Sequence, residues 1–187
     1  MSASCLTLAA EPARSSYRPR VELRTLRAGD ICAVQEVFAG LGSRSRELRF
    51  LTAKPRLTSA DLRQLTDVGH DDHIALLAIS TGRAIGVARF VRDREDPSSA
   101  DVAVAVVDAW QDRGVGTMLA EELGRRALEV GVRRFTMIMT LHNEGAVRLL
   151  HRVPGEIERL AIDEETAEFA ITLSEREDAW SDDLRRG

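Results

Sequence analysis

The chain has 187 residues, of which 44% are hydrophobic and 30% are charged, and its formal net charge is −4 at pH 7. These values predict one globular domain with its own core, and they exclude a collagen-like chain, a coiled coil and a wholly disordered chain. The mildly acidic balance argues against a protein that coats nucleic acid. No apolar run approaches the roughly 18 residues that a membrane span requires, so we expect no membrane partner.

The predicted domain covers residues 20–174. Residues 1–19 are rich in Ser, Ala, Pro and Arg and lack any period, which predicts a disordered N-terminal tail. Residues 175–187 are expected to form a C-terminal tail or a short helix. The two cysteines, Cys5 and Cys32, are too few for a disulfide framework and favour a reducing, cytoplasmic location.

The first elements in chain order are a predicted strand over residues 21–25 and three short helices. Asp30 is the expected N-cap of the first helix, and residues 43–51, which carry many arginines, predict the second. Thr58 and Asp61 have the spacing of a capping box and predict the start of the third helix. The apolar side of the first helix is expected to consist of Ile31, Cys32, Val34, Val37 and Phe38.

Strands and helices alternate in the rest of the chain. Residues 73–80 and 83–92 predict a hairpin, and residues 101–108 predict the most apolar strand, expected at the centre of the sheet. A long helix is predicted over residues 116–130, with Gly131 ending it. Its buried stripe is expected to consist of Val115, Met118, Leu119, Leu123, Ala127 and Val130. The remaining predicted elements are a strand over 133–141, a helix over 143–152 and strands over 156–163 and 165–173.

This order of elements predicts the fold class. The step from residue 101 to residue 140 is strand–helix–strand, so these two strands should be parallel and joined by a right-handed crossover. The other neighbouring strands are expected to be antiparallel. The sequence therefore predicts an α/β (mixed α+β) fold with a central, mostly antiparallel sheet of about seven strands and flanking helices.

Residues 106–117 (VVDAWQDRGVGT) carry the most specific functional signal. A buried strand ends there, a loop with Gln111, Arg113 and two glycines follows, and a helix begins at once. The first N–H groups of a helix have no partner inside it, and the helix dipole adds partial positive charge at that end. Because glycine lets the backbone approach an oxygen closely, the segment predicts a phosphate-binding loop with Gln111 and Arg113 as further donors.

Two other phosphate-binding patterns do not fit this loop. The mononucleotide loop needs a Lys-Ser/Thr pair after its glycines, and the dinucleotide fingerprint needs a third glycine where residue 119 is Leu. An ordinary turn between strand and helix is the simpler alternative. The longer pattern, Gln111-x-x-Gly114-x-Gly116 with Asn143 just beyond the next strand, is more specific than two glycines alone.

With this pattern the chain resembles the GNAT superfamily of acetyl-CoA-dependent N-acetyltransferases, whose signature is Q/R-x-x-G-x-G/A between the fourth strand and the third helix. The segments SRSRELRF, DDHIALLA, IGVARFVRD and VVDAWQDRGVGT further resemble the acetyltransferase domain of bacterial protein-lysine acetyltransferases of the Pat type. The resemblance implies a GNAT fold with a parallel, splayed pair of fourth and fifth strands. It also implies acetyl-CoA as co-substrate and a primary amine, expected to be a protein lysine, as acceptor.

The resemblance implies which residues hold acetyl-CoA. The diphosphate would lie on the amides of the loop, the pantetheine arm along the backbone of the fourth strand, and Asn143 would hold the arm or the nearby loop. A backbone N–H of the fourth strand would polarise the thioester carbonyl. The expected cofactor-binding residues are Val106, Val107, Gln111, Asp112, Arg113, Gly114, Val115, Gly116, Thr117 and Asn143.

The resemblance also implies a general base. A lysine amine, with a pKa of about 10.4, must lose a proton before it can attack. Pat-type enzymes use a glutamate near the start of the fourth strand, and the matching residue here is Asp101, with Asp108 as a weaker rival. Many GNAT enzymes have a tyrosine as general acid in the helix after Asn143, where this chain has Leu149 and Leu150. The thiolate would then leave unassisted or through water, which its pKa of about 8.5 permits.

Several alternatives stay open. The acceptor could be a small-molecule amine, and the chain could be a catalytically weak acyl-CoA-binding regulatory module or a nucleotide-dependent phosphate binder. Residues 70–73 (HDDH) contain possible metal ligands, but without a third cluster nearby no metal is expected. Arg44, Arg46 and Arg49 form either a solvated helix face or, as the resemblance implies, a wall that faces the acceptor.

Overall fold

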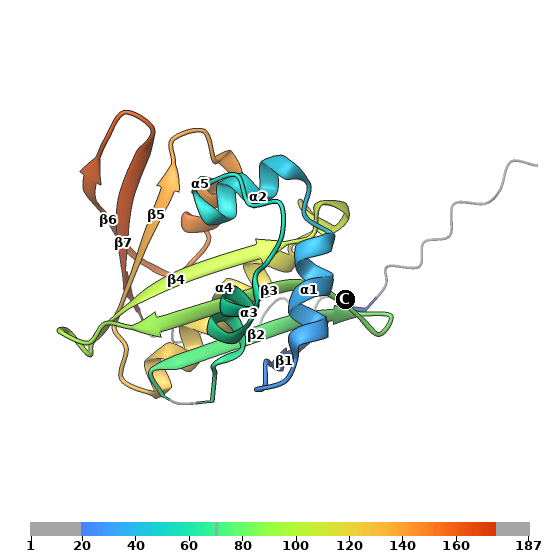
Figure 1. The fold of residues 1–187 in the computed structure, drawn as a ribbon. Coiled ribbons are helices and arrows are strands. Elements are labelled where there is room, and N and C mark those ends of the chain that lie inside the picture. Colours follow the sequence, from blue (N-terminus) through green and yellow to red (C-terminus); the bar gives the residue numbers. More distant parts are fainter. Residues whose placement is uncertain (1–19, 70, 175–187) are drawn as a thin grey trace, which may run out of the picture.

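The protein is described by a computed structural model that covers residues 20–69 and 71–174. Its architecture is one twisted sheet with helices packed against it (Figure 1). Four features of the sequence analysis lie outside the described residues: the two expected tails at 1–19 and 175–187, Cys5 and His70.

The sheet has seven strands in the order β1-β2-β3-β4-β5-β7-β6. Neighbouring strands are antiparallel except for β4 and β5, which are parallel. The expected fold class, including the single parallel pair, is therefore confirmed. The strands are β1 (Glu22–Thr25), β2 (His73–Ser80), β3 (Arg83–Arg92), β4 (Ser99–Val106), β5 (Arg134–Thr140), β6 (Gly155–Ile162) and β7 (Thr166–Leu173).

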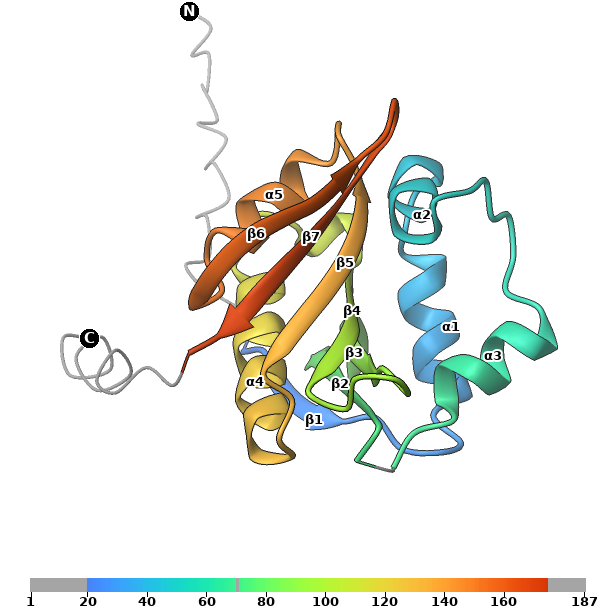
Figure 2. The same cartoon turned by 90° about the vertical axis from the view of Figure 1, so that its left-hand side faces the viewer.

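Helices cover both faces of the sheet (Figure 2). One face carries α1 (Ile31–Ala39), α2 (Ser43–Phe50) and α3 (Ser59–Thr66). The opposite face carries α4 (Val115–Glu129) and α5 (Glu144–Leu150). A short 3-10 turn, η1 (Asp108–Trp110), links β4 to the loop before α4.

Burial on both faces explains why the central strands are apolar without alternation. In β2 the run from Ala75 to Ala78 is at most 1% exposed at every position. Such continuous apolar runs are typical of strands that helices cover on both sides. Phe90 of β3 and Phe135 of β5 lie with their rings 5.9 Å apart and tie the two halves of the core together.

Two local signals in the sequence, a capping box and a glycine that ends a helix, are confirmed by the structure. The Thr58 hydroxyl accepts a hydrogen bond from the Asp61 N–H, and the Asp61 carboxylate accepts one from the Thr58 N–H, which together form the capping box of α3. After α4, Gly131 has a φ of +85°, the left-handed conformation that favours glycine at the end of a helix.

The predicted buried stripes are partly wrong. In α4, Met118 is 39% exposed, and the small residues Ala120 and Gly124 face the sheet, which lets the helix approach closely. In α1, Cys32 is exposed because it lies two residues, about 200° around the helix, from the buried Val34. Ile31, in the first turn of the same helix, is exposed as well.

The start of α1 agrees with the expectation only in position, since Asp30 is the N-cap residue of the helix. The Asp30 side chain makes no capping hydrogen bond within the helix. Its carboxylate accepts hydrogen bonds from the Arg24 guanidinium, at 2.6 and 3.1 Å, and from the Arg27 N–H. Two competing donors in the preceding segment therefore orient this carboxylate. Across the two described segments, no helix has the length and apolar character needed to cross a bilayer.

The fourth strand lies in the middle of the sheet, as expected, but it is not fully buried. It begins at Ser99 and ends at Val106, so that Asp108 falls in η1 rather than in the strand. From Val102 to Val106 its residues are only partly buried. The reason is a separation between β4 and β5, which leaves one edge of β4 facing a cavity.

Candidate functional site

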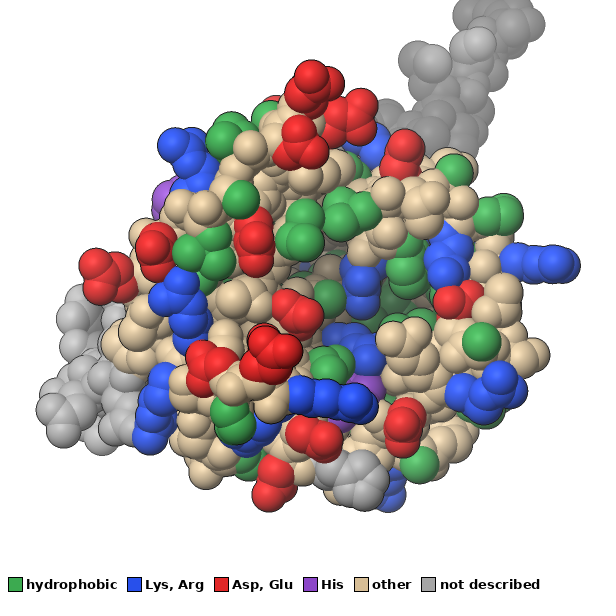
Figure 3. All heavy atoms as spheres, turned by 60° about the vertical axis from the view of Figure 1, so that its left-hand side comes forward, with side chains coloured by type: hydrophobic (Ala, Val, Ile, Leu, Met, Phe, Trp, Pro, Cys, Tyr) green, Lys and Arg blue, Asp and Glu red, His purple; other side chains and the backbone are tan. Residues whose placement is uncertain are grey.

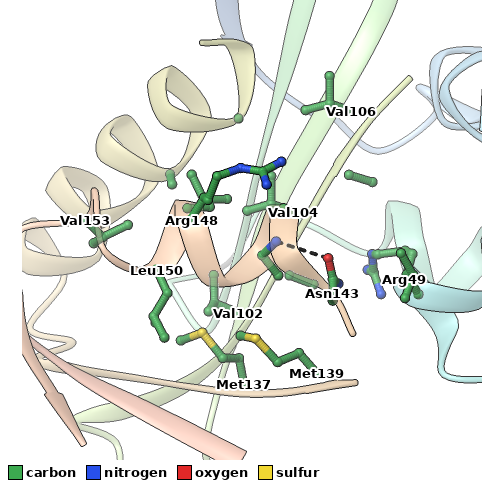
Figure 4. A pocket seen from close by; sticks show the side chains of 18 of the residues that line it. Arg49, Val102, Val104, Val106, Met137, Met139, Asn143, Arg148, Leu150 and Val153 are labelled. Carbon is green, nitrogen blue, oxygen red and sulfur yellow. Dashed lines mark hydrogen bonds between the residues drawn. The ribbon is translucent and has the colours of Figure 1, made fainter. Parts of the chain in front are cut away.

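The candidate site is a cavity between two parallel strands that diverge. The ladder between β4 and β5 consists of three pairs and ends at Asp101 and Thr136. Beyond that point the strands form walls of a cavity of about 750 Å³, which the loop before α4, α5 and α2 complete. Figure 4 shows the wall residues: Val102, Val104 and Val106 from β4, and Met137 and Met139 from β5.

The loop at one end of the cavity presents unpaired backbone amides. Gly114 is the N-cap of α4 with a φ of +83°, and the first helical hydrogen bond runs from the Met118 N–H to the Gly114 carbonyl. The amides of residues 115–117 precede that bond and therefore have no partner inside the helix. The first turn of α4 contains no acidic side chain, so its partial positive charge is uncompensated there. This end of the cavity suits an anion.

The Gln111 side chain fixes this loop to the rest of the site. Its Nε2 lies 3.0 Å from the Val106 carbonyl oxygen, 3.2 Å from Asp108 Oδ1 and 3.3 Å from Ser45 Oγ. Asp108 in turn accepts a hydrogen bond from the Gly42 N–H through Oδ2. These contacts give Asp108 a structural position and hold the loop against both β4 and α2.

The backbone of β4 offers free hydrogen-bonding groups to the cavity. Val107 donates its N–H to the Ile85 carbonyl of β3, so its amide faces away from the gap. Because successive residues of a strand point their N–H and C=O groups to opposite edges, those of Val104 and Val106 face the gap, where the Val106 carbonyl already accepts a hydrogen bond from Gln111. An extended amide chain could pair with this edge as an additional strand.

Helix α5 closes the cavity and adds positive charge. Asn143 caps α5 by accepting the Ala146 N–H at 3.0 Å, as the dashed line in Figure 4 shows. Arg148 and Arg152, one turn apart, both line the cavity. The Arg148 guanidinium contacts Asp112 at 3.3 Å and Glu144 at 3.4 Å, and all three side chains are more than half exposed. Such exposed pairs are weak, so Arg148 is free to bind another anion.

The structure brings most of the expected cofactor residues together at this cavity. Two of the others, Val107 and Val115, are buried behind it at 8% and 1% exposure. The Arg113 guanidinium lies 5.3 Å from the Trp110 ring and does not line the cavity. The expected residues that do line it are Val106, Gln111, Asp112, Gly114, Gly116, Thr117 and Asn143.

Asp101 lies just outside the cavity, where β4 and β5 begin to separate. It is exposed, and its Oδ1 accepts a hydrogen bond from the Thr136 hydroxyl at 2.7 Å. A Cβ added at Gly116 of α4 would lie 3.7 Å from the Val106 side chain, so Val106 points toward α4. Because residues two apart in a strand share a face, the even-numbered residues of β4 face α4 and α5. Asp101 therefore points to the other face of the sheet, toward the side of α1, α2 and α3. An amine that reaches the gap from that side would meet its carboxylate.

The three arginines of α2 occupy different environments. Arg44 is exposed, whereas the Arg46 guanidinium lies 4.3 Å from the Phe38 ring centroid and donates to the Pro55 carbonyl. Only Arg49 lines the cavity. Burial, reinforced by the charge of Arg89, lowers the pKa of Arg49 from its ordinary value to about 10. The sequence analysis treated the three residues alike, and the structure separates them.

Several residues of the cavity were not anticipated from the sequence. The alternation of Met137 and Met139 in β5 was a usable signal, because i and i+2 residues of a strand share a face. Arg148 and Arg152 gave no such signal, since their segment meets the cavity only through tertiary packing. Within residues 20–69 and 71–174 no group of three or more His, Cys, Asp or Glu side chains is placed to hold a metal ion.

Comparison with known proteins places this geometry in context. The acetyltransferase (GNAT) family model matches residues 43–155. The chain is 30% identical over 133 residues to acetyltransferase Pat of Mycolicibacterium smegmatis, a match that covers 70% of this chain and 40% of that protein. The chain therefore spans well under half the length of this relative.

Solved structures share the fold. The GNAT domain of S. lividans PAT superimposes with a TM-score of 0.76 at 23% identity, over 82% of this chain and 90% of that one. A Salmonella typhimurium structure, described as an acetyltransferase with its cofactor acetyl-CoA, superimposes with a TM-score of 0.63 at 17% identity, over 83% of this chain and 95% of that one. Identities this low show a shared architecture and nothing finer.

Proposed function

The chain belongs to the acetyltransferase (GNAT) family, and from that premise we propose that it transfers an acetyl group from acetyl-CoA directly to a primary amine, with a protein lysine as acceptor. The observation that carries the proposal is the cavity between the splayed strands, which ends on the unpaired amides at the start of α4.

The cavity fits the parts of acetyl-CoA in order. The diphosphate would bind the amides of residues 115–117, where the helix end is positive and Arg148 is close by. The pantetheine arm contains two amides, which would pair with the edge of β4 at Val104 and Val106. The thioester would then lie near the point where β4 and β5 separate, next to Asp101.

Asp101 is the proposed general base. It would take a proton from the acceptor ammonium, directly or through one water molecule, and the neutral nitrogen would attack the thioester carbonyl carbon. A C–N bond forms, the C–S bond breaks, and the sulfur leaves with the electron pair as a thiolate. Leu149 lines the cavity where many family members have a tyrosine, so water would carry the second proton from the acceptor nitrogen to the thiolate, which completes the amide and CoA.

Two comparisons support a protein lysine as acceptor. Four segments of the sequence resemble Pat-type protein-lysine acetyltransferases, and a matched relative is acetyltransferase Pat. A competing function is a binding module with little turnover. The contact of Asp101 with Thr136 favours this alternative, because a carboxylate held by a neighbouring hydroxyl is less available as a base.

The test is thiol release from acetyl-CoA in the presence of a lysine-containing peptide. We expect amine-dependent release of CoA together with a mass increase of one acetyl group on the peptide. Acetyl-CoA binding without turnover on any amine would favour the binding module. Thermal protection by ATP but not by acetyl-CoA would instead identify a nucleotide-dependent phosphate binder and contradict the proposal.

A further inference from the structure

Two arginines, Arg49 and Arg89, lie on the acceptor side of the sheet without an acidic partner among the described residues. Arg89 of β3 pairs in register with Ala75 of β2 and Ala103 of β4. Paired residues share a face, and so do residues two apart in a strand, so His73, Arg89 and Asp101 all lie on the face opposite α4. The Arg89 guanidinium donates to the Gln64 carbonyl of α3, which agrees with this placement.

Arg89 is buried, at 8% exposure, and its neighbours in the sheet are alanines. The small side chains of Ala75 and Ala103 leave room for a guanidinium between the sheet and the helices. Arg49 reaches the same region from α2 and is directed into the cavity (Figure 4). Arg89 lies within electrostatic range of both Arg49 and His73, since its charge lowers the pKa of each after the larger effect of burial.

The described part of the chain provides no counter-charge for these two guanidiniums. Arg49 stacks 5.0 Å from the Phe50 ring, Arg89 bonds one carbonyl, and neither forms an ion pair with a described carboxylate. The Nε2 of His73, in the same group, is buried without a hydrogen-bond partner. Figure 3 shows a hollow with basic side chains inside it and acidic ones near its rim. Buried cations close together are costly unless an anion joins them.

We propose that Arg49, backed by Arg89, binds a carboxylate of the acceptor, so that the enzyme selects amines that carry a carboxylate close to the reactive nitrogen. This inference rests on the acetyltransferase function proposed above. Arg49 supplies a planar fork that matches a carboxylate, and Arg89 acts behind it as a positioning residue that adds charge. Asp101, on the same face but nearer β5, would receive the amine end of the same acceptor.

The carboxylate could belong to a protein segment or to a free amino acid, and two pairs of acceptor substrates distinguish these sources. The first pair is a lysine peptide with Glu beside the lysine and the same peptide with Gln in that place. The second pair is Nα-acetyl-lysine, which has a free carboxylate, and its carboxamide. We expect kcat/KM to be about tenfold to a hundredfold higher for the acidic member of one pair, the range of a charged hydrogen-bonded contact. The pair that shows the difference identifies the source as a protein segment or a free amino acid.

The variant Arg49→Gln should abolish that preference and leave the dissociation constant of acetyl-CoA unchanged. The matched control is Arg63→Gln, which removes one positive charge from an exposed position on α3 and should keep the preference. Equal rates within both pairs for the wild-type protein would overturn the inference while leaving the acetyltransferase function intact. A loss of acetyl-CoA affinity in Arg49→Gln with the preference retained would also overturn it, because Arg49 would then serve the coenzyme. If no amine is acetylated at all, the result contradicts the proposed acetyltransferase function itself, on which this inference rests.

Discussion

At the scale of single residues, the proposed chemistry depends most on Asp101. Its exposed carboxylate lies where β4 and β5 separate, and Thr136 is its hydrogen-bonding neighbour. Replacement by Asn preserves the shape and the contact with Thr136 but removes the base. We expect Asp101→Asn to lower kcat by about 100-fold or more with little change in acetyl-CoA affinity. Steady-state kinetics with a lysine peptide, alongside calorimetry, measures both.

The control for this prediction is Asp101→Glu, which extends the carboxylate by one methylene. It should retain activity because it keeps the carboxylate that the proposed base requires. If Asp101→Asn turned over acceptor as fast as the wild-type protein, Asp101 would not be the base, and the acidic residue would have to be sought elsewhere on that face.

A second prediction concerns Arg148, whose weak contacts with Asp112 and Glu144 leave it able to bind a phosphate group. We expect Arg148→Gln to weaken acetyl-CoA binding by roughly fivefold to tenfold at low salt, the size of one exposed charge contact. The difference should shrink at high ionic strength because screening reduces the attraction in the wild-type protein. Arg94→Gln, at an exposed loop position, serves as the matched control and should bind as the wild-type protein does. A salt-independent loss would show that Arg148 acts through structure instead.

At the scale of elements, the junction of β4, η1 and α4 is the central unit, and its two glycines have different roles. Gly114 has a φ of +83°, which side chains disfavour, whereas a Cβ at Gly116 would make only ordinary contacts, at 3.7 Å or more. We expect Gly114→Ala to reduce the free energy of unfolding by about 1–2 kcal/mol and to weaken acetyl-CoA binding. Gly116→Ala should unfold at a denaturant concentration at or above that of the wild-type protein. Equal losses in the two variants would contradict this account of the loop.

The third helix supplies a prediction about pH. The Asp61 carboxylate accepts hydrogen bonds from Lys54 and from the N–H and hydroxyl of Thr58, which lowers its pKa from 3.8 to about 2. A carboxyl whose pKa is lower in the folded state contributes stability above its unfolded pKa and loses it as the pH falls. Asp61→Asn should therefore destabilise the protein at pH 5, and the difference from wild type should shrink steadily as the pH falls from about 4 toward the folded pKa of about 2.

Urea unfolding at a series of pH values measures this difference, and Asp71→Asn, at an exposed position, is the matched control. A constant gap between wild type and Asp61→Asn over the whole pH range would contradict the assignment. The gap would then come from lost packing at the start of α3 rather than from the titration of this carboxyl.

At the scale of the whole molecule, the splay between β4 and β5 connects the fold with the proposed function, because it opens the middle of the sheet into the cavity that we propose binds acetyl-CoA. The sequence predicted the elements well wherever the signal was local. The capping box at Thr58, the left-handed Gly131 and the parallel crossover from β4 to β5 all follow from short-range rules. The succession of strand, loop and helix over residues 106–117 was predicted for the same reason.

Features that depend on tertiary packing could not be predicted in this way. The exposure of Met118 and Cys32 depends on how each helix is rotated against the sheet, which periodicity fixes only coarsely. Val107 was expected at the cofactor, but the edge to which its amide points is set by the register with β3. Arg49 of α2 and Arg89 of β3 lie close enough to interact electrostatically although they are 40 positions apart in the sequence. No local pattern indicates this proximity.

The most direct test of the account is calorimetric titration of the folded protein with CoA and with pantetheine, which lacks the diphosphate and the 3′-phosphoadenosine. If the amides at the start of α4 bind the diphosphate, CoA should bind in the micromolar range and pantetheine about 100-fold or more weakly. Absence of binding heat with millimolar CoA, or equal affinities for the two compounds, would contradict the account.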